Sequence, residues 1–331
     1  MLADRGENEA LRGLLAARVM QDLLRYDVGP TTLFKRSVRQ YAIFRGPVTA
    51  TASPADIAAG MMCLSANMPA DAVAFVSAVP CDSAVHELLT SPASPLKRTF
   101  HILPWGQPNL HCKIDWTGTS EAYLASLGFD SRRNLKRYAK KLFGDGSINA
   151  RVERFRHPQD VDRFILDGSS VSDKTYQKRR LGLGLSPGGS TERRIRFAAE
   201  RKGFLGHILY LGDRPAAFHY GFIFRRTFFV LQMGYDPAFS AHQPGSVLFF
   251  EVLRDVEKLK LDVTTIDCLP GVTDFKLRTT NQKVRIRNFY LFKRSFSGSL
   301  LYAWLRALDA LATAAKRIVR RVSGRPGRVA A

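Results

Sequence analysis

The chain has 331 residues, of which 45% are hydrophobic and 24% are charged. This composition excludes a wholly disordered chain and a disulfide mini-protein, and it favours one large or two medium domains with a substantial core. Fifty Lys and Arg against 29 Asp and Glu give a net charge of +21. Such a field attracts nucleic acid, anionic lipid or a nucleotide-bearing cofactor, and the charge alone does not choose among them.

The cysteines are too scattered for a metal site or a disulfide framework, because no CxxC or Cys/His ligand spacing occurs. We therefore expect no metal and a reducing, cytoplasmic location. Acidic residues interrupt the N-terminal sequence, which argues against a signal peptide. No run of 18 uncharged apolar residues occurs, so we expect no membrane-spanning helix.

Residues 1–118 are predicted to mix short helices with strands such as 74–79 and 109–116, around an irregular Pro-rich stretch over 90–108. A basic helix follows, with Ser131 as its cap and Gly144 at its end. Two neighbouring rows of cations cover this helix: Arg132, Lys136 and Lys140, and Arg133, Arg137 and Lys141. They form either a solvated face or a binding site for an anionic partner.

The clearest pattern begins at residue 204. Before it, the sequence predicts a strand over 148–155, helical sequence to about 178 and a Gly-rich loop over 181–189. Residues 204–235 then predict three antiparallel strands. The sequence then predicts a loop, an amphipathic helix over 246–261, a buried strand over 264–269, a last strand over 284–293 and a C-terminal helix.

Three strings carry a resemblance to a known family: EAYLASLGFDSRRNLKRYAKKL, YDPAFSAHQPGSVLFFEVL and IDCLPGVTDFKLR. They resemble the GNAT superfamily of acyl-CoA N-acyltransferases, in particular the bacterial branch associated with cellulose and exopolysaccharide biosynthesis. The resemblance implies a mixed, mainly antiparallel α/β (α+β) fold. We expect two GNAT-like halves in tandem, over 1–118 and 119–295, and a basic amphipathic C-terminal segment over 296–331.

The loop before the amphipathic helix is the expected donor site. Backbone N–H groups at a helix N-terminus are unsatisfied and lie at the positive end of the dipole. Gly245 would let a pyrophosphate approach closely, beside Pro244 and the hydroxyl of Ser246. The resemblance implies that acetyl-CoA or another acyl-CoA binds there, with its pantetheine between two splayed strands near Gln232. The loop has fewer Gly and basic residues than is usual in the superfamily, and it is also compatible with a plain surface turn.

An N-acyltransferase needs a base near neutral pKa and an N–H aimed at the oxyanion. His219, on the middle strand of the three, is the candidate base, with a buried structural histidine as the competing interpretation. Tyr235 is the candidate acid for the departing thiolate. Asp267 interrupts an apolar strand and needs a partner.

Lys276 and Arg278 match the family string "YK.r", with Phe275 in place of its Tyr. Either cation could pair with Asp267 and hold the loop, or could bind the acceptor together with Arg133 and Arg137. The acceptor is expected to be a small molecule or a polysaccharide precursor.

The C-terminal sequence concentrates the charge, since residues 276–331 hold fourteen Lys and Arg against the single acid Asp309. Its amphipathic helix, with apolar Leu301, Trp304 and Leu308, predicts either peripheral binding to anionic lipid at the inner face of the membrane or docking onto the domain.

The leading hypothesis is therefore a cytoplasmic acyltransferase that moves an acyl group from acyl-CoA to an amine or hydroxyl. A Fem-type transferase that uses aminoacyl-tRNA comes second, since tRNA binding would explain the charge. A non-catalytic membrane-associated scaffold is the alternative from another class.

Overall fold

The computed structural model describes residues 2–5, 11–28, 31–44, 53–144, 148–175, 178 and 184–323, with side chains between residues 15 and 314 of these. The chain forms two compact units. Unit 1 comprises residues Met1–Asn109 and Arg285–Ala331, and unit 2 comprises Leu110–Val284. Strands β6 (Phe100–Asp115) and β12 (Gln282–Lys293) run from one unit into the other.

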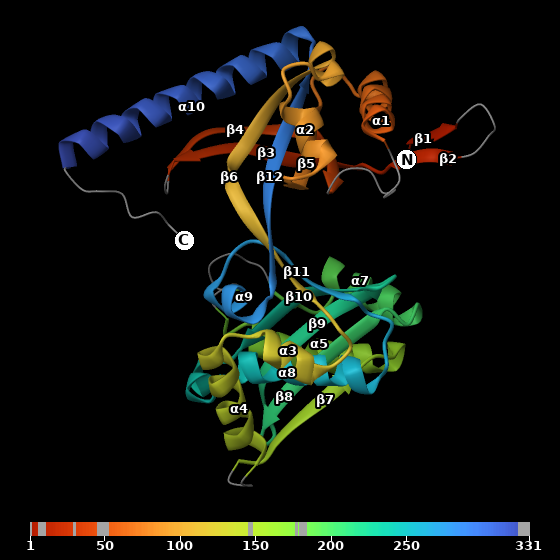
Figure 1. Cartoon of the computed structure of the whole chain (residues 1–331), viewed down its shortest axis with the longest axis vertical. Coiled ribbons are helices and arrows are strands. Elements are labelled where there is room, and N and C mark those ends of the chain that lie inside the picture. Colours follow the sequence, from red (N-terminus) through yellow and green to blue (C-terminus); the bar gives the residue numbers. More distant parts are fainter. Residues whose placement is uncertain are drawn as a thin grey trace. The chain divides into compact units, whose positions relative to one another are not determined.

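Unit 1 is built on a sheet with the strand order β3-β4-β5-β12-β6. The pairs β3–β4 and β5–β12 are antiparallel, whereas β4–β5 is parallel. Figure 1 shows these elements, whose bounds are β1 (Leu2–Arg5), β2 (Leu11–Leu15), β3 (Arg18–Val28), β4 (Thr31–Phe44), α1 (Pro54–Asn67), β5 (Val73–Pro80), α2 (Ala84–Thr90), η1 (Pro95–Arg98) and α10 (Phe296–Ser323).

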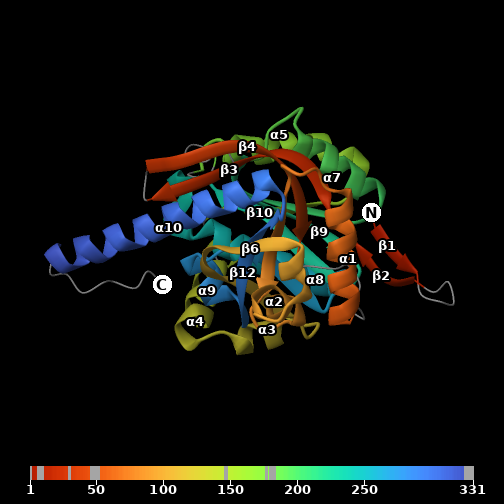
Figure 2. The ribbon, with the colours of Figure 1, turned by 90° about the horizontal axis from the view of Figure 1, so that it is seen from above.

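Helix α10 docks onto the sheet of unit 1 through one face. Leu301 and Leu305 are buried in a cluster with Leu24 of β3, Val38 of β4 and Phe292 of β12. The hydroxyl of Tyr26 donates a hydrogen bond of 2.9 Å to Asp309 of α10, so the helix is also held by a polar contact. Both views of the molecule show α10 beside β3 and β4 (Figures 1 and 2).

Unit 2 is built on strands in the order β6-β11-β10-β9-β8-β7. All described pairs are antiparallel except β10–β11, which is parallel. The elements are α3 (Ser120–Ser126), α4 (Phe129–Phe143), β7 (Ala150–Phe155), η2 (Pro158–Asp160), α5 (Val161–Ser172), α7 (Ser190–Glu200), β8 (Phe204–Leu211), β9 (Arg214–Phe224), β10 (Thr227–Tyr235), η3 (Pro237–His242), α8 (Pro244–Lys258), β11 (Thr265–Pro270) and α9 (Asp274–Thr279).

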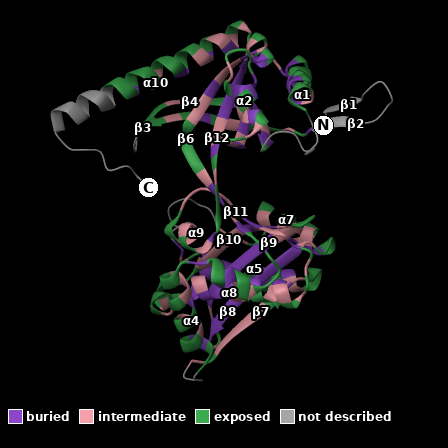
Figure 3. Ribbon diagram, viewed as in Figure 1, coloured by how far each residue is buried: buried purple, intermediate pink, exposed green. Residues whose placement is uncertain are grey.

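Helices cover both faces of this sheet, which is why every residue of β8 is buried (Figure 3). Leu205 and Leu209 of β8 pack with Leu253 of α8 on one face. Phe204 and Ile208 pack with residues of α5 and α7 on the other. Alternate side chains of a strand point to opposite faces, so a strand between two helical layers becomes apolar throughout.

The predicted class, mixed α/β with mainly antiparallel strands, is confirmed, as is the run of three strands, helix and strand from β8 to β11. Two local predictions are wrong. The stretch predicted as irregular over 90–108 holds η1 and the start of β6, and α4 begins at Phe129 after an N-cap at Gly128 rather than at Ser131. Part of the predicted Gly-rich loop, residues 181–183, lies outside the described residues.

Candidate functional site

The centre of unit 2 contains one parallel strand pair that ends early. Strands β10 and β11 pair at Thr227–Thr265, Phe228–Ile266 and Phe229–Asp267. Both strands continue beyond the last pair, β10 over residues 230–235 and β11 over residues 268–270. The two strands therefore separate from Phe229 and Asp267 onward.

A bulge lies in β10 where the separation begins. Val230 is opposite Gly221 of β9 and Gln232 is opposite Tyr220, so Leu231 is an extra residue in this register. A bulge leaves one residue outside the ladder and bends the strand. The side chain of Gln232 accepts a hydrogen bond of 3.4 Å from the hydroxyl of Tyr220, which ties the bulged segment to β9.

The N-terminus of α8 meets the end of β10. Gln243 precedes the helix in the left-handed region, with φ 50°, and Pro244 occupies the first turn. A Cβ on Gly245 would lie 3.3 Å from Cδ1 of Tyr235, so the tyrosine ring packs against the bare backbone there. Two predicted site residues, Tyr235 and Gly245, are thus neighbours, with Pro244 and Ser246 beside them in the first turn of α8.

Tyr235 keeps its access to solvent in this position, with 43% of the residue exposed. The first turn of α8 carries no acidic residue. The amides of Ser246 and Val247 donate to the carbonyl of Gln243. The first turn of α8 thus lies beside a partly exposed phenol, with Pro244 and Gly245 buried and Ser246 half-buried.

A buried carboxylate organises the end of β11. Oδ1 of Asp267 lies 2.6 Å from Nε2 of His111 in β6, and both side chains are buried. The same oxygen accepts the N–H of Leu269 at 2.8 Å. Leu269 has φ 62°, a conformation that is costly for a residue other than glycine. The carboxylate thus compensates for a strained backbone at the point where β11 leaves β10.

Lys276 continues this network from α9. Its Nζ donates to the carbonyls of Leu269 at 3.0 Å and Pro270 at 3.3 Å. Burial lowers the pKa of Lys276, although the nearby Cys268 and Asp267 act in the opposite direction. Burial also raises the pKa of the Cys268 thiol to about 12, so this thiol is not a nucleophile at neutral pH.

We call His111, Asp267, Leu269 and Lys276 the splay network. It includes His111, which the sequence analysis did not select as a candidate. The predicted partner of Asp267 was Lys276 or Arg278, whereas its carboxylate bonds His111 and a backbone amide. Arg278 instead donates to the carbonyl of Asp274 within α9. His111 stands in an alternating strand sequence, so only the pairing of β6 with β11 identifies its partner.

A second buried carboxylate lies just after β10. Asp236 accepts a bond of 2.7 Å from Nζ of Lys174 and one of 3.0 Å from the N–H of Ala238. Burial raises the pKa of Asp236, but these two bonds outweigh it and hold the pKa below its ordinary value.

A Cβ on Gly234 would lie 2.8 Å from Cγ2 of Thr175, so glycine permits this close approach to the chain after α5.

His219 of β9 lies opposite Met233 in the separated part of β10, but its side chain is buried in the core. Its ring neighbours Phe228 and Phe249 at 5.8 and 6.0 Å, and neither ring nitrogen has a hydrogen-bond partner among the described residues. Burial, with a smaller effect of His207, holds its pKa well below the usual range. The imidazole is therefore neutral and enclosed, an arrangement that favours the structural interpretation; its role as a base stays a prediction.

The basic helix α4 presents its cations to solvent. Arg133 and Arg137 are exposed, and α4 packs against α8, β7 and η3, the short helix before the N-terminus of α8. The guanidinium of Arg137 stacks on Tyr138 at 4.9 Å. The two arginines thus lie on an element next to the loop at α8, and their acceptor role stays a prediction.

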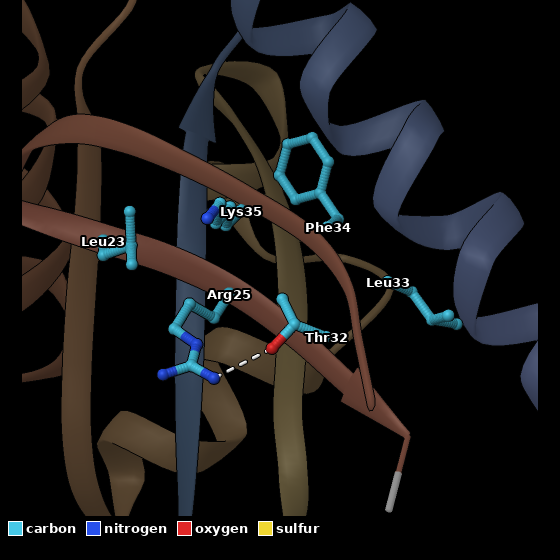
Figure 4. Close-up of a pocket in the computed structure, with 6 residues that line it drawn as sticks. All are labelled: Leu23, Arg25, Thr32, Leu33, Phe34 and Lys35. Carbon is cyan, nitrogen blue, oxygen red and sulfur yellow. Dashed lines mark hydrogen bonds between the residues drawn. The ribbon is translucent and has the colours of Figure 1, made fainter. Parts of the chain in front are cut away.

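Unit 1 carries a separate pocket of about 490 Å³ on the β3–β4 hairpin (Figure 4). Leu23, Leu33, Phe34 and Lys35 line it with Arg25, which donates to Thr32 at 2.9 Å. None of the residues that line it is a His, Cys, Asp or Glu, so we do not assign the chemistry to it. Among the described residues no group of His, Cys, Asp and Glu could hold a metal ion.

Comparison with known proteins agrees with this geometry. Residues 130–277, which include β10, β11 and α8, match a family model described as an acetyltransferase (GNAT) domain. The structure of FemX is similar, with a TM-score of 0.56 and 12% identity over 91% of this chain and 89% of that chain. The chain has a GNAT fold. The domain match agrees with the superfamily expected from the three strings and supports an acyltransferase-type function.

A second similar structure is the C-terminal domain (DUF2156) of a putative lysylphosphatidylglycerol synthetase from Agrobacterium fabrum. It has a TM-score of 0.51 and 12% identity over 87% of this chain and 88% of that chain. A comparison with curated proteins finds no match. Both structural neighbours cover most of this chain, and at these identities they establish the fold alone.

The splay network gives a testable stability difference. Asp267→Asn removes the carboxylate from a buried pair and weakens the bond to the Leu269 amide, so we expect the free energy of unfolding to fall by about 2–4 kcal/mol. Urea denaturation measures it. Asp262→Asn is the matched control, because that exposed carboxylate pairs only with the exposed Arg226 among the described residues and should change stability by less than about 0.5 kcal/mol. Equal effects of the two variants would contradict the network's role.

Proposed function

We propose that this GNAT protein transfers an acetyl or other acyl group from acyl-CoA to an amine or hydroxyl acceptor. The observation that carries the proposal is the separation of β10 and β11 beyond Phe229 and Asp267, directly beside the N-terminus of α8. From the resemblance of the three sequence strings, we propose a small molecule or a polysaccharide precursor of the cell envelope as the acceptor.

The donor would bind along the edge of β10 that faces away from β9. Its pantetheine, which carries amide groups, would pair with the backbone of residues 230–235, which β11 leaves without a parallel neighbour. Its pyrophosphate would lie at Gly245 and Ser246, where the positive end of the helix dipole and the absence of a side chain favour an anion. Gln232 would fix the donor through its side-chain amide.

The reaction needs no covalent enzyme intermediate. The acceptor nitrogen or oxygen attacks the thioester carbonyl, a new N–C or O–C bond forms, and the C–S bond then breaks. The proton lost by the acceptor ends on the CoA thiolate. We assign the donation of that proton to Tyr235, which is partly exposed beside Gly245, and the stabilisation of the oxyanion to the backbone N–H at the Leu231 bulge.

In this proposal the buried Asp267 acts as a positioning residue. With His111 and Lys276 it holds Leu269 in its strained conformation and thereby keeps β11 away from β10. Lys276 and Arg278 on α9, together with Arg133 and Arg137 on α4, are proposed to bind the acceptor.

A second candidate donor is aminoacyl-tRNA. The exposed cations of α4 beside η3 favour it, because phosphate contacts dominate nucleic-acid binding. A non-catalytic scaffold is the remaining alternative, and it predicts binding of neither donor.

The donor site is tested by calorimetric titration with acetyl-CoA and with a long-chain acyl-CoA. We expect saturable binding of at least one, and at least a hundredfold weaker binding by Gly245→Trp, because an indole would fill the space at the helix N-terminus and displace Tyr235. Gly128→Trp is the control, since a Cβ there meets nothing within 4 Å.

Aminoacyl-tRNA is titrated at the same salt concentration. Salt-sensitive tRNA binding without acyl-CoA binding would replace the donor we propose, and binding of neither would favour the scaffold.

The two candidate proton-transfer residues are separated by kinetics on the best acceptor from a panel of amines and alcohols, followed by thiol release from acyl-CoA. Tyr235→Phe should lower kcat about a hundredfold or more with little change in donor affinity. His219→Leu should retain most of the turnover, because the imidazole is enclosed and neutral. Loss of turnover in His219→Leu at an unchanged melting temperature would restore the histidine as the base and contradict our assignment.

A further inference from the structure

Helix α10 exposes a second apolar stripe besides the one that docks it. Four large side chains on its outer side are exposed: Phe296 at 87%, Leu300 at 61%, Trp304 at 54% and Leu311 at 67%. With 3.6 residues per turn, these four positions lie within an arc of about 80° around the helix axis. They form one continuous face, which we call the outer stripe.

Docking onto unit 1 does not account for the outer stripe. The sheet contacts use Leu301 and Leu305, which are buried and, like the buried Ala312, lie on the neighbouring face of the helix. In Figure 3 most residues of the described part of α10 are coloured as exposed. Scattered exposed apolar residues are ordinary on protein surfaces, but a contiguous stripe of Phe, Leu and Trp indicates a binding surface.

The charges on α10 indicate what covers this stripe. By sequence the helix contains five cations, Arg306, Lys316, Arg317, Arg320 and Arg321, and a single acid, Asp309. Asp309 accepts a hydrogen bond from Tyr26 of β3, so this acid is turned toward the sheet. Arg306 is exposed, and the other four cations follow in the last turns, where their side chains lie outside the described residues.

We propose that the outer stripe of α10 binds the surface of an anionic lipid bilayer. An apolar face on a helix with an excess of cations is suited to the boundary between headgroups and acyl chains, with the helix lying in the plane of the interface. Trp304 supplies the aromatic residue that favours this depth. No helix in the described part of the chain is long and apolar enough to cross a membrane.

The apolar outer stripe and the cations of α10 contribute together to membrane affinity. A single apolar stripe gives weak membrane affinity, and cations near an anionic surface each add to it until salt screens them. Since α10 is docked by Leu301 and Leu305, the stripe is already formed before the membrane is reached. The bound helix therefore needs no folding step on the lipid.

Vesicle flotation of the full chain tests this proposal. Vesicles of equal parts phosphatidylglycerol and phosphatidylcholine are compared with phosphatidylcholine alone, each at 0.1 M and 0.5 M NaCl. We expect binding to the anionic vesicles at low salt, at least about tenfold weaker binding at high salt or without phosphatidylglycerol, and at least about tenfold weaker binding when the four stripe residues are replaced by Ser.

The matched control replaces three exposed apolar residues of unit 2 by Ser: Leu166, Phe197 and Phe224. It should float like the wild type. Melting temperatures verify that each variant folds, and the single change Trp304→Ser, expected to weaken binding about threefold, covers the case in which the fourfold variant unfolds. The proposal would be overturned if both stripe variants floated like the wild type. It would also be overturned if the control lost binding equally or if the wild type did not float. A stripe-dependent dimer that does not float would overturn it as well, because a second copy of the chain would then be the occupant.

Discussion

The proposed donor site depends on the buried hydrogen bonds at the point where the pairing of β10 with β11 ends. Asp267 sits in the last pair of that ladder, and its carboxylate accepts from His111 on one neighbouring strand and from the amide of Leu269 ahead of it. Burial of a carboxylate without such donors would strongly destabilise the folded protein. Because the bonds are made, β11 can turn through the left-handed conformation of Leu269, and backbone of β10 becomes available beside α8.

The electrostatics around this opening are consistent with an anionic donor. The two nearest buried carboxylates are compensated, Asp236 by Lys174 and Asp267 by the splay network, so neither opposes an anion at α8. The first turn of α8 has no acid, and the basic α4 lies against η3. Part of the net charge of +21 lies on α4 of unit 2, near the proposed donor site, and part lies on α10 of unit 1, where we propose a lipid surface.

Periodicity predicted the elements of this fold far better than the side-chain partners. The apolar alternation of β8 to β10 and the helical spacing of α8 are local, so the strand and helix order followed from the sequence. The long β3–β4 hairpin was not predicted, since its polar and charged residues obscure the alternation. Asp267 was selected correctly as a group that needs a partner, but His111 is 156 residues away, and only the sheet register brings it near. For His219 the sequence could not decide which face of the strand carries the side chain, because a strand residue has an equal chance of either. In the structure its ring lies on the face enclosed by Phe228 and Phe249.

Hydrogen–deuterium exchange with and without acetyl-CoA tests the central claim most directly, since it reads the backbone at the separated strands. The account predicts slower exchange in residues 230–235 of β10 and 243–247 at the start of α8 when the ligand is added, with no change in β7 at the far edge of the sheet. Protection confined to other segments, or none at saturating acetyl-CoA, would contradict the assignment of this opening as the donor site.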